Sequence, residues 1–577
     1  MASPLPSEPR PERSDSRCES PSPTTGIGAS WWILVLLAYA VLVTAVSFRV
    51  REQINRDGIA YIRLAEHLVK GEFDLSVSSH WSPLITWCLA PLVAAGVDGL
   101  YAGRIVVAVW GGVFLIVAGL LMSRVGALSG PWGRGAFALL ALWMVNWVAR
   151  VIAPDVMLGA CIALYLLAVT HPRLLQRSRR QFLCGLCAGL AYLAKAYAFP
   201  FFVVHYPVML ALAGLREGPG SPSGIAAPPA PSRLVRVGRA WVLGMLGFAL
   251  VGGPWMGVLS WKSGHFTFST AGRYNRSIVG PPGVAQEQPD WRGLWSPRPG
   301  QISVWETPET LPVAEWSPLQ SRAYLKHEIV HAAKNGRLIR KMISEFDFAG
   351  LALCAILASP LAFLVLRQRR QDAFGAFWIP ATCLIYCSGY AFVLVENRYL
   401  EPVLWPLCWF WCVHLVRCLW DRVAPDAGAP CARGVRTTAR LPVAFLVAVF
   451  GVFPAAELTA AVAQGRTDTY RRMAYQLRKA GETGPIAATR RVDGLFIAYH
   501  MREPFLGSPE ADTWGPCEAE LRDKDVRLFL VWPESPLAKA DLGRSAFAPV
   551  DALDPLKGSQ GERVRVFRLA APVATSR

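Results

Sequence analysis

Long runs of apolar residues without a charged side chain dominate the pattern of this chain. Each run has about 18 to 23 residues, enough for a helix rising roughly 1.5 Å per residue to cross a hydrocarbon layer of about 30 Å. The runs show no alternation of apolar and polar positions, so α-helices are expected rather than barrel strands. They cover 31–48, 105–122, 240–261, 348–366 and 373–395. The pattern predicts an all-α polytopic membrane protein with about 11 to 12 transmembrane helices.

Composition agrees with this prediction. The 577 residues are 53% hydrophobic and 17% charged, whereas soluble domains average about 25% charged residues. The net charge of +18 does not indicate nucleic acid, because most Arg residues fall in short segments between apolar runs, where they set membrane topology. Most of the 13 Cys lie inside apolar runs, including the pair Cys184-x-x-Cys187, and no Cys/His cluster with zinc spacing occurs. We therefore expect neither a disulfide framework nor a structural metal site.

The positions of the basic residues predict which segments lie on the cytoplasmic side of the membrane and which lie on the outer side. Residues 1–30 are rich in Pro, Ser and charge and are expected to form a disordered cytoplasmic tail. Residues 31–464 form the transmembrane domain, with outer loops at 49–81 and 262–346. Four basic patches in short connections mark the cytoplasmic side: Arg173/Arg177/Arg179/Arg180, Arg233/Arg236/Arg239, Arg367/Arg369/Arg370 and Arg417/Arg422/Arg433/Arg436/Arg440.

One early apolar segment cannot span if this topology holds. With the N-terminus inside, Asp57 and Asp155 both lie outside only if a segment between them fails to cross. The segment 82–97 is short and contains Pro83 and Pro91. We expect it to be re-entrant or partial, which leaves about 11 spans.

The C-terminal residues 465–577 differ from the rest. Their pattern predicts a helix at 468–481 and strands at 485–489, 525–532 and 563–569. We expect a small extracytoplasmic α/β domain.

Two carboxylates stand at the starts of predicted outer segments. Residues 56–71 carry apolar side chains at helical spacing, which predicts an amphipathic helix on the membrane surface with Asp57 at its start. Asp155 follows Pro154 where another helix begins. For both residues the alternatives are an N-cap and a catalytic carboxylate.

Three cationic or titratable side chains map to the same face. Lys195 interrupts an apolar stretch 13 residues after Phe182, roughly 20 Å along a helix. It either snorkels to the interface or faces a phosphate. Arg398 either pairs with Glu396 or Glu401 or binds a phosphate through its bidentate fork. His80, which opens the next apolar segment, is either an interfacial residue or a substrate contact.

Five short motifs in this order resemble the GT-C superfamily of integral-membrane glycosyltransferases, which includes bacterial aminoarabinose and protein O-mannosyl transferases. They extend over roughly 31–420 and are Arg56-Asp57-Gly58 with Tyr61, His80-x-x-Pro83-Leu84, Ala153-Pro154-Asp155, the stretch 189–200 around Lys195, and Asn397-Arg398-Tyr399-Leu400-x-Pro402. The chain departs from the usual pattern at Trp81-Ser82, where a Pro is frequent, and at Ala153, where an Arg is frequent.

The resemblance implies an inverting transfer of a hexosyl or pentosyl group from a polyprenyl-phosphate donor to a lipid, glycan or protein acceptor. It implies that Asp57 is the base and that Asp155 assists it or binds a divalent cation, Mg or Mn. Lys195 and Arg398 would hold the donor phosphate, with Tyr61, His80 and Tyr399 as further substrate-binding residues. The expected location is the bacterial inner membrane, with the active site facing outside.

A transporter or flippase of lipid-linked sugars is the main alternative, since intramembrane Lys and Asp are typical of that class as well. Transporters tend to contain two related halves, and the sequence shows no internal repeat. A non-catalytic scaffold would leave a buried Lys195 unexplained.

Overall fold

The computed structural model describes residues 29–124, 130–216, 232–284, 291, 293–345, 373–423, 455–456, 458–460, 463, 468–539, 547–550 and 556–569. The sequence also predicts membrane spans at 347–367, around the apolar run 348–366, and at 441–463. Both lie largely or wholly outside the described residues, as does most of the tail 1–30. The fold class predicted from the sequence is confirmed: a helical bundle is followed by a small C-terminal sheet domain.

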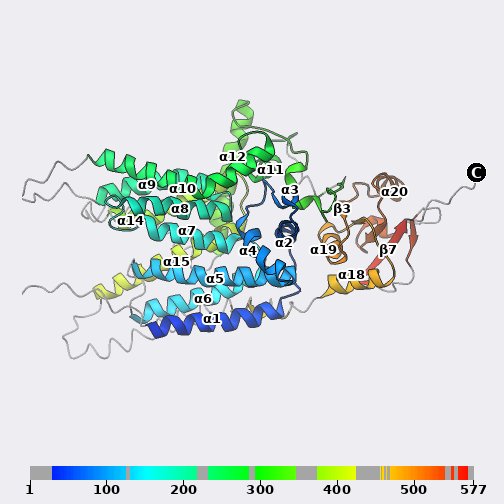
Figure 1. Cartoon of the computed structure of the whole chain (residues 1–577), viewed down its shortest axis with the longest axis horizontal. Helices are drawn as coiled ribbons and strands as arrows, with labels where there is room; N and C mark the ends of the chain where they lie inside the picture. Colours follow the sequence, from blue (N-terminus) through cyan, green and yellow to red (C-terminus); the bar gives the residue numbers. More distant parts are fainter. Residues whose placement is uncertain are drawn as a thin grey trace, which may run out of the picture.

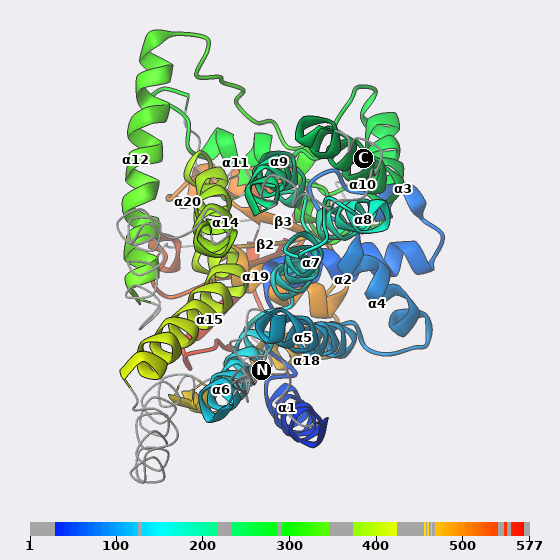
Figure 2. The ribbon, with the colours of Figure 1, turned by 90° about the vertical axis from the view of Figure 1, so that its left-hand side faces the viewer.

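Long apolar helices lie side by side along the longest axis of the molecule (Figure 1), and most are seen end-on in Figure 2. They are α1 (Ala29–Arg49), α5 (Gly99–Arg124), α6 (Gly130–Arg150), α7 (Asp155–Val169), α8 (Ser178–Ala194), α9 (Ala198–Arg216), α10 (Arg233–Ser263), α14 (Ala373–Ala391) and α15 (Asn397–Val423). Connected neighbours such as α7 and α8 run in opposite directions, so their short connection lies at the end of the bundle away from Asp155 and Lys195.

Four helices within the described residues are long and apolar enough to cross a membrane: Trp31–Arg49, Gly99–Arg124, Ala198–Arg216 and Arg233–Ser263. The surface of α5 shows what they face. Ile105, Val109, Val113, Ile116 and Leu120 are exposed and recur every three or four residues, so they form one continuous apolar stripe. Water does not favour such a stripe on several neighbouring helices, whereas lipid does.

The segment 82–97 forms α4 (Leu84–Ala94), which has 11 residues. At about 1.5 Å per residue it is roughly half as long as a span requires. Ser82 before it lines the pocket described below, while Gly96 after it lines a cavity shared with Arg502 of the C-terminal domain. Both ends of α4 therefore lie at the same end of the bundle.

The amphipathic helix predicted from residue 56 is α2 (Arg56–Val69). Its expected position on a membrane surface is wrong. Both faces are covered by protein: α4 and α5 pack against one part of it, and η1 (Val304–Glu306) and α19 (Arg491–Met501) pack against another. The apolar pattern correctly predicts a helix, but the apolar face of this helix is covered by protein segments, some of them distant in the sequence, and not by lipid.

A break in the chain at Lys195 corrects a second prediction. The helix α8 ends at Ala194, and Lys195 has an extended backbone (φ −154°, ψ 126°). The next helix already begins at Ala198, so Pro200 is its third residue. Proline is tolerated in the first turn of a helix because the amide it lacks has no partner there, so Pro200 does not mark the boundary.

The loop between α10 and α14 is mostly ordered into short elements and one long helix. These are α11 (Ala271–Ile278), η1, η2 (Pro308–Thr310) and α12 (Arg322–Glu345). The Lys262 ammonium at the end of α10 donates to Val77 O at 2.5 Å, directly after the short helix α3 (Phe73–Ser76) between α2 and α4. In Figures 1 and 2, α12 stands across the direction of the bundle helices, beside α14.

The C-terminal domain contains a mixed sheet in the order β1-β3-β2-β4-β7-β5, with β6 also paired to β7. Strands β2 (Ile486–Ala488), β3 (Phe505–Ser508) and β4 (Leu528–Val531) are parallel, joined by α19 and α20 (Trp514–Asp523); α18 (Thr469–Lys479) precedes them. After η4 (Pro536–Lys539) come three further strands, β5 (Phe547–Pro549), β6 (Leu556–Lys557) and β7 (Arg563–Leu569). Strands β5 and β6 both pair antiparallel with β7. The predicted α/β character of this segment is thus observed, and β7 has the bounds read from the sequence.

The long loop contributes the edge strand of this domain. Strand β1 (Gly293–Leu294) pairs antiparallel with β3, and the Trp295 amide donates to Leu506 O at 2.7 Å. Further along, the Phe505 amide donates to Ile302 O at 2.7 Å. The loop is therefore fixed to the sheet on both sides of residues 296–301, just before it reaches the pocket.

Candidate active site

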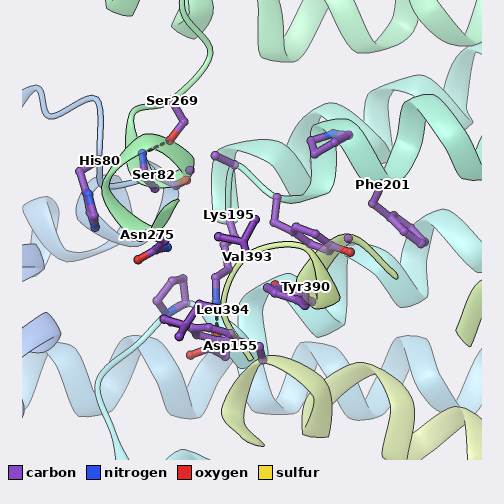
Figure 3. A pocket seen from close by; sticks show the side chains of 18 of the residues that line it. His80, Ser82, Asp155, Lys195, Phe201, Ser269, Asn275, Tyr390, Val393 and Leu394 are labelled. Atoms are coloured by element: carbon purple, nitrogen blue, oxygen red, sulfur yellow. Dashed lines mark hydrogen bonds and ion pairs between the residues drawn. The ribbon is translucent and has the colours of Figure 1, made fainter. Parts of the chain in front are cut away.

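A cavity of about 530 Å³ opens at the end of the bundle that faces the C-terminal domain. Its walls come from α2, α7, α9, α11, α14 and the start of α15, so segments separated by more than 300 residues meet there. All seven residues predicted from the sequence line it: Asp57, Tyr61, His80, Asp155, Lys195, Arg398 and Tyr399. Figure 3 shows Lys195 directed at Asp155, with His80 and Asn275 across the pocket.

Asp57 is held by two donors. Its Oδ2 accepts a hydrogen bond from Arg398 Nη1 at 2.6 Å, and its Oδ1 accepts one from Trp305 Nε1 at 3.2 Å. Arg398 also donates from Nε to Glu396 Oε2 at 2.6 Å. Burial alone would raise the pKa of Asp57, but Arg398 and Arg56, together with the two hydrogen bonds, bring that pKa below its ordinary value. Asp57 is therefore a carboxylate at neutral pH.

A second ion pair lies beside the first. Lys195 Nζ donates to Asp155 Oδ1 at 2.7 Å, and the same ammonium lies 3.6 Å from the centre of the Tyr399 ring. Asp155 is the first residue of α7, where the helix dipole favours a negative charge. The break after Ala194 frees Lys195 from helical geometry and lets its side chain turn toward α7. Two ion pairs, Arg398–Asp57 and Lys195–Asp155, thus line the same pocket.

The capping alternatives for the two carboxylates are wrong. The residue before α2 is Asn55, and Asp57 is the second residue of the helix. Asn55 instead binds the backbone of Ile152, accepting from its amide at 2.9 Å and donating to its carbonyl at 3.2 Å. These bonds fasten the start of α2 to the segment just before Asp155, which brings the two carboxylates to one site.

An aromatic cluster adjoins Asp57. The ring of His80 lies 4.6 Å from that of Trp81, 5.2 Å from Tyr274 and 5.5 Å from Trp305. Tyr61 packs edge-on against Trp81 at 5.0 Å. Burial raises the pKa of the Tyr61 hydroxyl well above its ordinary value, so this group stays protonated. Flat aromatic faces beside a charged group offer both stacking area and a dry environment for a polar substrate.

Buried ionic contacts fix the orientation of α2. The Glu306 carboxylate, fully buried, accepts from the Ile302 amide at 2.6 Å and lies 3.0 Å from His67 Nε2. The other ring nitrogen of His67 lies 2.5 Å from Glu72 Oε2. Arg63, one turn before His67, donates to Gly300 O at 2.7 Å. These contacts tie α2 to the loop that carries Trp305.

The divalent cation left open by the sequence does not fit these carboxylates. Both oxygens of Asp57 already accept hydrogen bonds, and Asp155 is paired with a cation. Within the described residues, no group of three or more His, Cys, Asp or Glu side chains is arranged to hold a metal ion. We therefore derive no step through a metal.

Sequence reasoning missed several residues of the site. Trp305 is the most important, because it donates a hydrogen bond to Asp57 across 248 positions of sequence, although it does not itself line the pocket. Its local signal is a capping box, in which Ser303 and Glu306 bond to each other's backbone amides and form the short helix η1. Tyr197 and Tyr390, stacked at 3.9 Å, complete the wall near Lys195. No signal in the sequence separated them from ordinary core aromatics.

No protein-family model and no curated protein matches the chain. Among solved structures, ArnT from Cupriavidus metallidurans, determined bound to undecaprenyl phosphate, matches over 95% of this chain and 100% of its own, with 15% identity and a TM-score of 0.51. A mutant of the arabinofuranosyltransferase AftD from Mycobacteria matches over 95% of this chain and 42% of its own, with 12% identity and a TM-score of 0.44. The first of these two matches shows that the chain shares the fold of ArnT.

Proposed function

We propose that the chain is a membrane glycosyltransferase that moves a sugar, with inversion, from a polyprenyl-phosphate donor to a hydroxyl of an extracytoplasmic lipid, glycan or protein acceptor. The observation that carries the proposal is the meeting of Asp57, Asp155, Lys195 and Arg398 in one pocket. The fold shared with ArnT, a protein solved with undecaprenyl phosphate, supports a polyprenyl-phosphate donor.

The proposed reaction requires a base for the acceptor hydroxyl and positive charge beside the leaving phosphate, and the pocket contains both. The acceptor oxygen attacks the anomeric carbon, the bond from that carbon to the phosphate oxygen breaks, and the electron pair leaves with the polyprenyl phosphate. The hydroxyl proton passes to Asp57. Lys195 and Arg398 stabilise the negative charge that grows on the phosphate, which is the larger electrostatic demand of the step.

The two cations are neutralised by carboxylates while no donor is bound. A phosphate entering between them competes with Asp57 for Arg398 and with Asp155 for Lys195. When Arg398 turns toward the phosphate, Asp57 loses its principal counter-charge and its pKa rises. Donor binding thus makes Asp57 a better base at the moment when the acceptor needs one.

The side of the membrane follows from charge. Arg173, Arg177, Arg179 and Arg180 lie between or at the ends of α7 and α8, away from Asp155 and Lys195. Basic residues in short connections stay in the cytoplasm. The pocket then faces outward, where the C-terminal domain also lies (Figure 1).

The decisive experiment is incubation of the purified protein with labelled polyprenyl-phosphate hexose or pentose and candidate acceptors, followed by mass analysis of the products. We expect Asp57→Asn, made in membranes at the normal level, to lose transfer. Asp74→Asn is the control, because Asp74 is an exposed carboxylate outside the pocket.

Two results would overturn the proposal. Full transfer by Asp57→Asn would remove Asp57 from the mechanism. Movement of the lipid-linked sugar across the membrane without covalent transfer would identify a transporter or flippase instead.

A further inference from the structure

The helix α12 has an unusual position for a helix of 24 residues. It stands upright in both views, whereas the bundle helices run horizontally in Figure 1 and are mostly seen end-on in Figure 2. It therefore runs across the bundle direction, at the end where the pocket opens. For a bundle that spans a bilayer, this is the plane of the lipid headgroups.

The inner face of α12 is fully engaged with the protein. Glu328 pairs with Arg276 at 3.3 Å, and His327 Nε2 lies 2.9 Å from Val279 O. One turn further, His331 Nε2 lies 2.9 Å from Val393 O, and Asn335 Nδ2 donates to Ala391 O at 3.0 Å. These contacts fix the rotation of the helix about its own axis.

The fixed rotation leaves an apolar stripe outside. Leu325 and Ile329, one turn apart, are 46% and 62% exposed. Ala332 and Gly336 continue the same line at helical spacing, with no charged residue on it. A helix whose outer face is exposed to water would carry polar residues along that line.

A basic arc borders this stripe. Lys326, Lys334, Arg337 and Lys341 are exposed and recur at steps of eight, three and four residues, which places them on one side of the helix. The whole helix carries six Lys or Arg against two Glu. The ion pairs of this region, Arg276–Glu328 and Arg273–Glu315, do not involve Lys326, Lys334 or Arg337.

We propose that α12 lies in the outer headgroup region and binds anionic phospholipids: Leu325 and Ile329 enter the acyl boundary while the basic arc contacts the headgroup phosphates. An apolar stripe flanked by Lys and Arg is the pattern of interfacial helices. Anionic headgroups supply the charge complementary to the arc. This inference concerns a surface outside the pocket and stands independently of the proposed function.

The first test measures lipid selectivity. The full-length protein is reconstituted in nanodiscs of phosphatidylcholine with one third phosphatidylglycerol, extracted in mild detergent, and its retained lipids are quantified by mass spectrometry. We expect enrichment of phosphatidylglycerol in the wild type. Each basic residue near an anionic surface contributes roughly five-fold to binding, so in the triple variant Lys334→Gln, Arg337→Gln, Lys341→Gln the ratio of phosphatidylglycerol to phosphatidylcholine in the retained lipid should fall to the ratio of the nanodisc bilayer.

The control removes the same charge elsewhere. Arg472→Gln, Lys524→Gln, Arg527→Gln changes three exposed residues of the C-terminal domain and should keep the wild-type enrichment. Equal enrichment in both triple variants would overturn the proposal. A conservative variant, Lys334→Arg with Lys341→Arg, should retain the lipid, which separates lost charge from a misfolded helix.

The second test asks what covers the apolar stripe. A photoreactive benzoylphenylalanine at Ile329 is expected to cross-link to phospholipid, whereas the same group at the exposed Tyr475 of the C-terminal domain is not. A cross-link from Ile329 to a second copy of the chain or to another protein would overturn the proposal.

Discussion

Each oxygen of the Asp57 side chain has its own donor, and the two donors come from different parts of the fold. Arg398 is the second residue of α15, whereas Trp305 belongs to the long loop. The Trp305 indole also lies 3.3 Å beneath the Arg56 guanidinium. We infer that Trp305 positions Asp57 for its proposed role, since it fixes the one oxygen that Arg398 does not hold.

Replacing Trp305 tests this role. Trp305→Phe keeps an aromatic ring but removes the donor, and a hydrogen bond to a charged group contributes about 1.5–3 kcal/mol. We expect transfer to fall by roughly ten- to a hundred-fold on that basis. Asp57 must be ionised to act, and its pKa is low in the wild type. Losing a donor raises this pKa, so the acid limb of the pH–rate profile should move to higher pH.

The shift in the pH profile distinguishes positioning from a structural defect. A variant that merely folds less well would lose activity at every pH without moving the limb. An unchanged limb together with unchanged activity would contradict the role given to Trp305.

The pair Lys195–Asp155 makes a separate prediction. Its side chains are 22% and 8% exposed, so Lys195→Met leaves a nearly buried carboxylate without its partner, at a cost approaching about 3 kcal/mol. The double variant Lys195→Met, Asp155→Asn removes both charges and should recover most of that stability. Donor binding should not recover, because the phosphate still lacks its cation.

Thermal unfolding and the KM for the polyprenyl donor measure the two effects separately. If the double variant regains wild-type donor affinity as well as stability, Lys195 does not bind the phosphate.

At the scale of elements, the orientation of α2 decides where Asp57 points, and Glu306 is the residue that fixes it. Glu306→Gln keeps the shape of the side chain but leaves His67 and Arg63 with one counter-charge fewer in a buried place. Breaking a buried ionic contact costs about 3–5 kcal/mol. We expect a lower melting temperature and, because η1 carries Trp305, reduced transfer by the fraction that stays folded.

The control is Glu315→Gln in the same loop. Its carboxylate is 69% exposed and pairs with Arg273 at the surface, a kind of contact worth about 0–1 kcal/mol. Its melting temperature and activity should match the wild type. Equal effects of the two substitutions would show that the buried cluster does not hold α2.

The elements also show what local pattern can and cannot predict. Charge-free runs located α1 and α10, yet α10 begins at Arg233 because its basic residues continue the helix to the membrane edge. The short β3 was missed, since four residues that include a glycine give no strand signal. Lys195 was expected within a helix that continues from Phe182, and no local pattern indicates that α8 ends at Ala194 and that the backbone of Lys195 is extended.

For the site, topology placed Asp57, His80, Asp155, Lys195 and Arg398 on one face, and the family resemblance added Tyr61 and Tyr399; all seven line one pocket. Their pairing was not predictable. That Arg398 contacts Asp57 as well as its neighbour Glu396 depends on residues 341 positions apart meeting at one point. The residues of η1 and α19 that cover α2 are likewise far from it in the sequence, and hydrophobic periodicity does not predict contacts between distant segments.

At the scale of the whole molecule, the C-terminal domain is connected to the pocket through the long loop. Strand β1 extends the sheet at β3, and eleven residues after its end the same loop brings Trp305 to Asp57. Arg502 of this domain donates to Glu66 of α2 at 2.7 Å, which adds a second link. The domain therefore helps to build the end of the bundle that contains the pocket, as well as to cover it.

The seam between β1 and β3 depends on Gly507, and changing this residue tests the connection. Its φ of +125° favours glycine, and an added Cβ would lie 2.6 Å from Gly293 O and 2.5 Å from Arg491 Nη1. Gly507→Val should therefore separate β1 from the sheet, because strain at such a position costs about 1–3 kcal/mol before the clash is counted. We expect transfer to fall several-fold and the loop 295–316 to be cleaved faster in limited proteolysis, while the bundle still inserts in the membrane. The matched control is Gly515→Ala on α20, where a Cβ meets nothing within 4 Å and alanine favours the helix by up to about 1 kcal/mol. Wild-type activity in Gly507→Val, despite a loosened loop, would mean that Trp305 reaches Asp57 without support from the C-terminal domain.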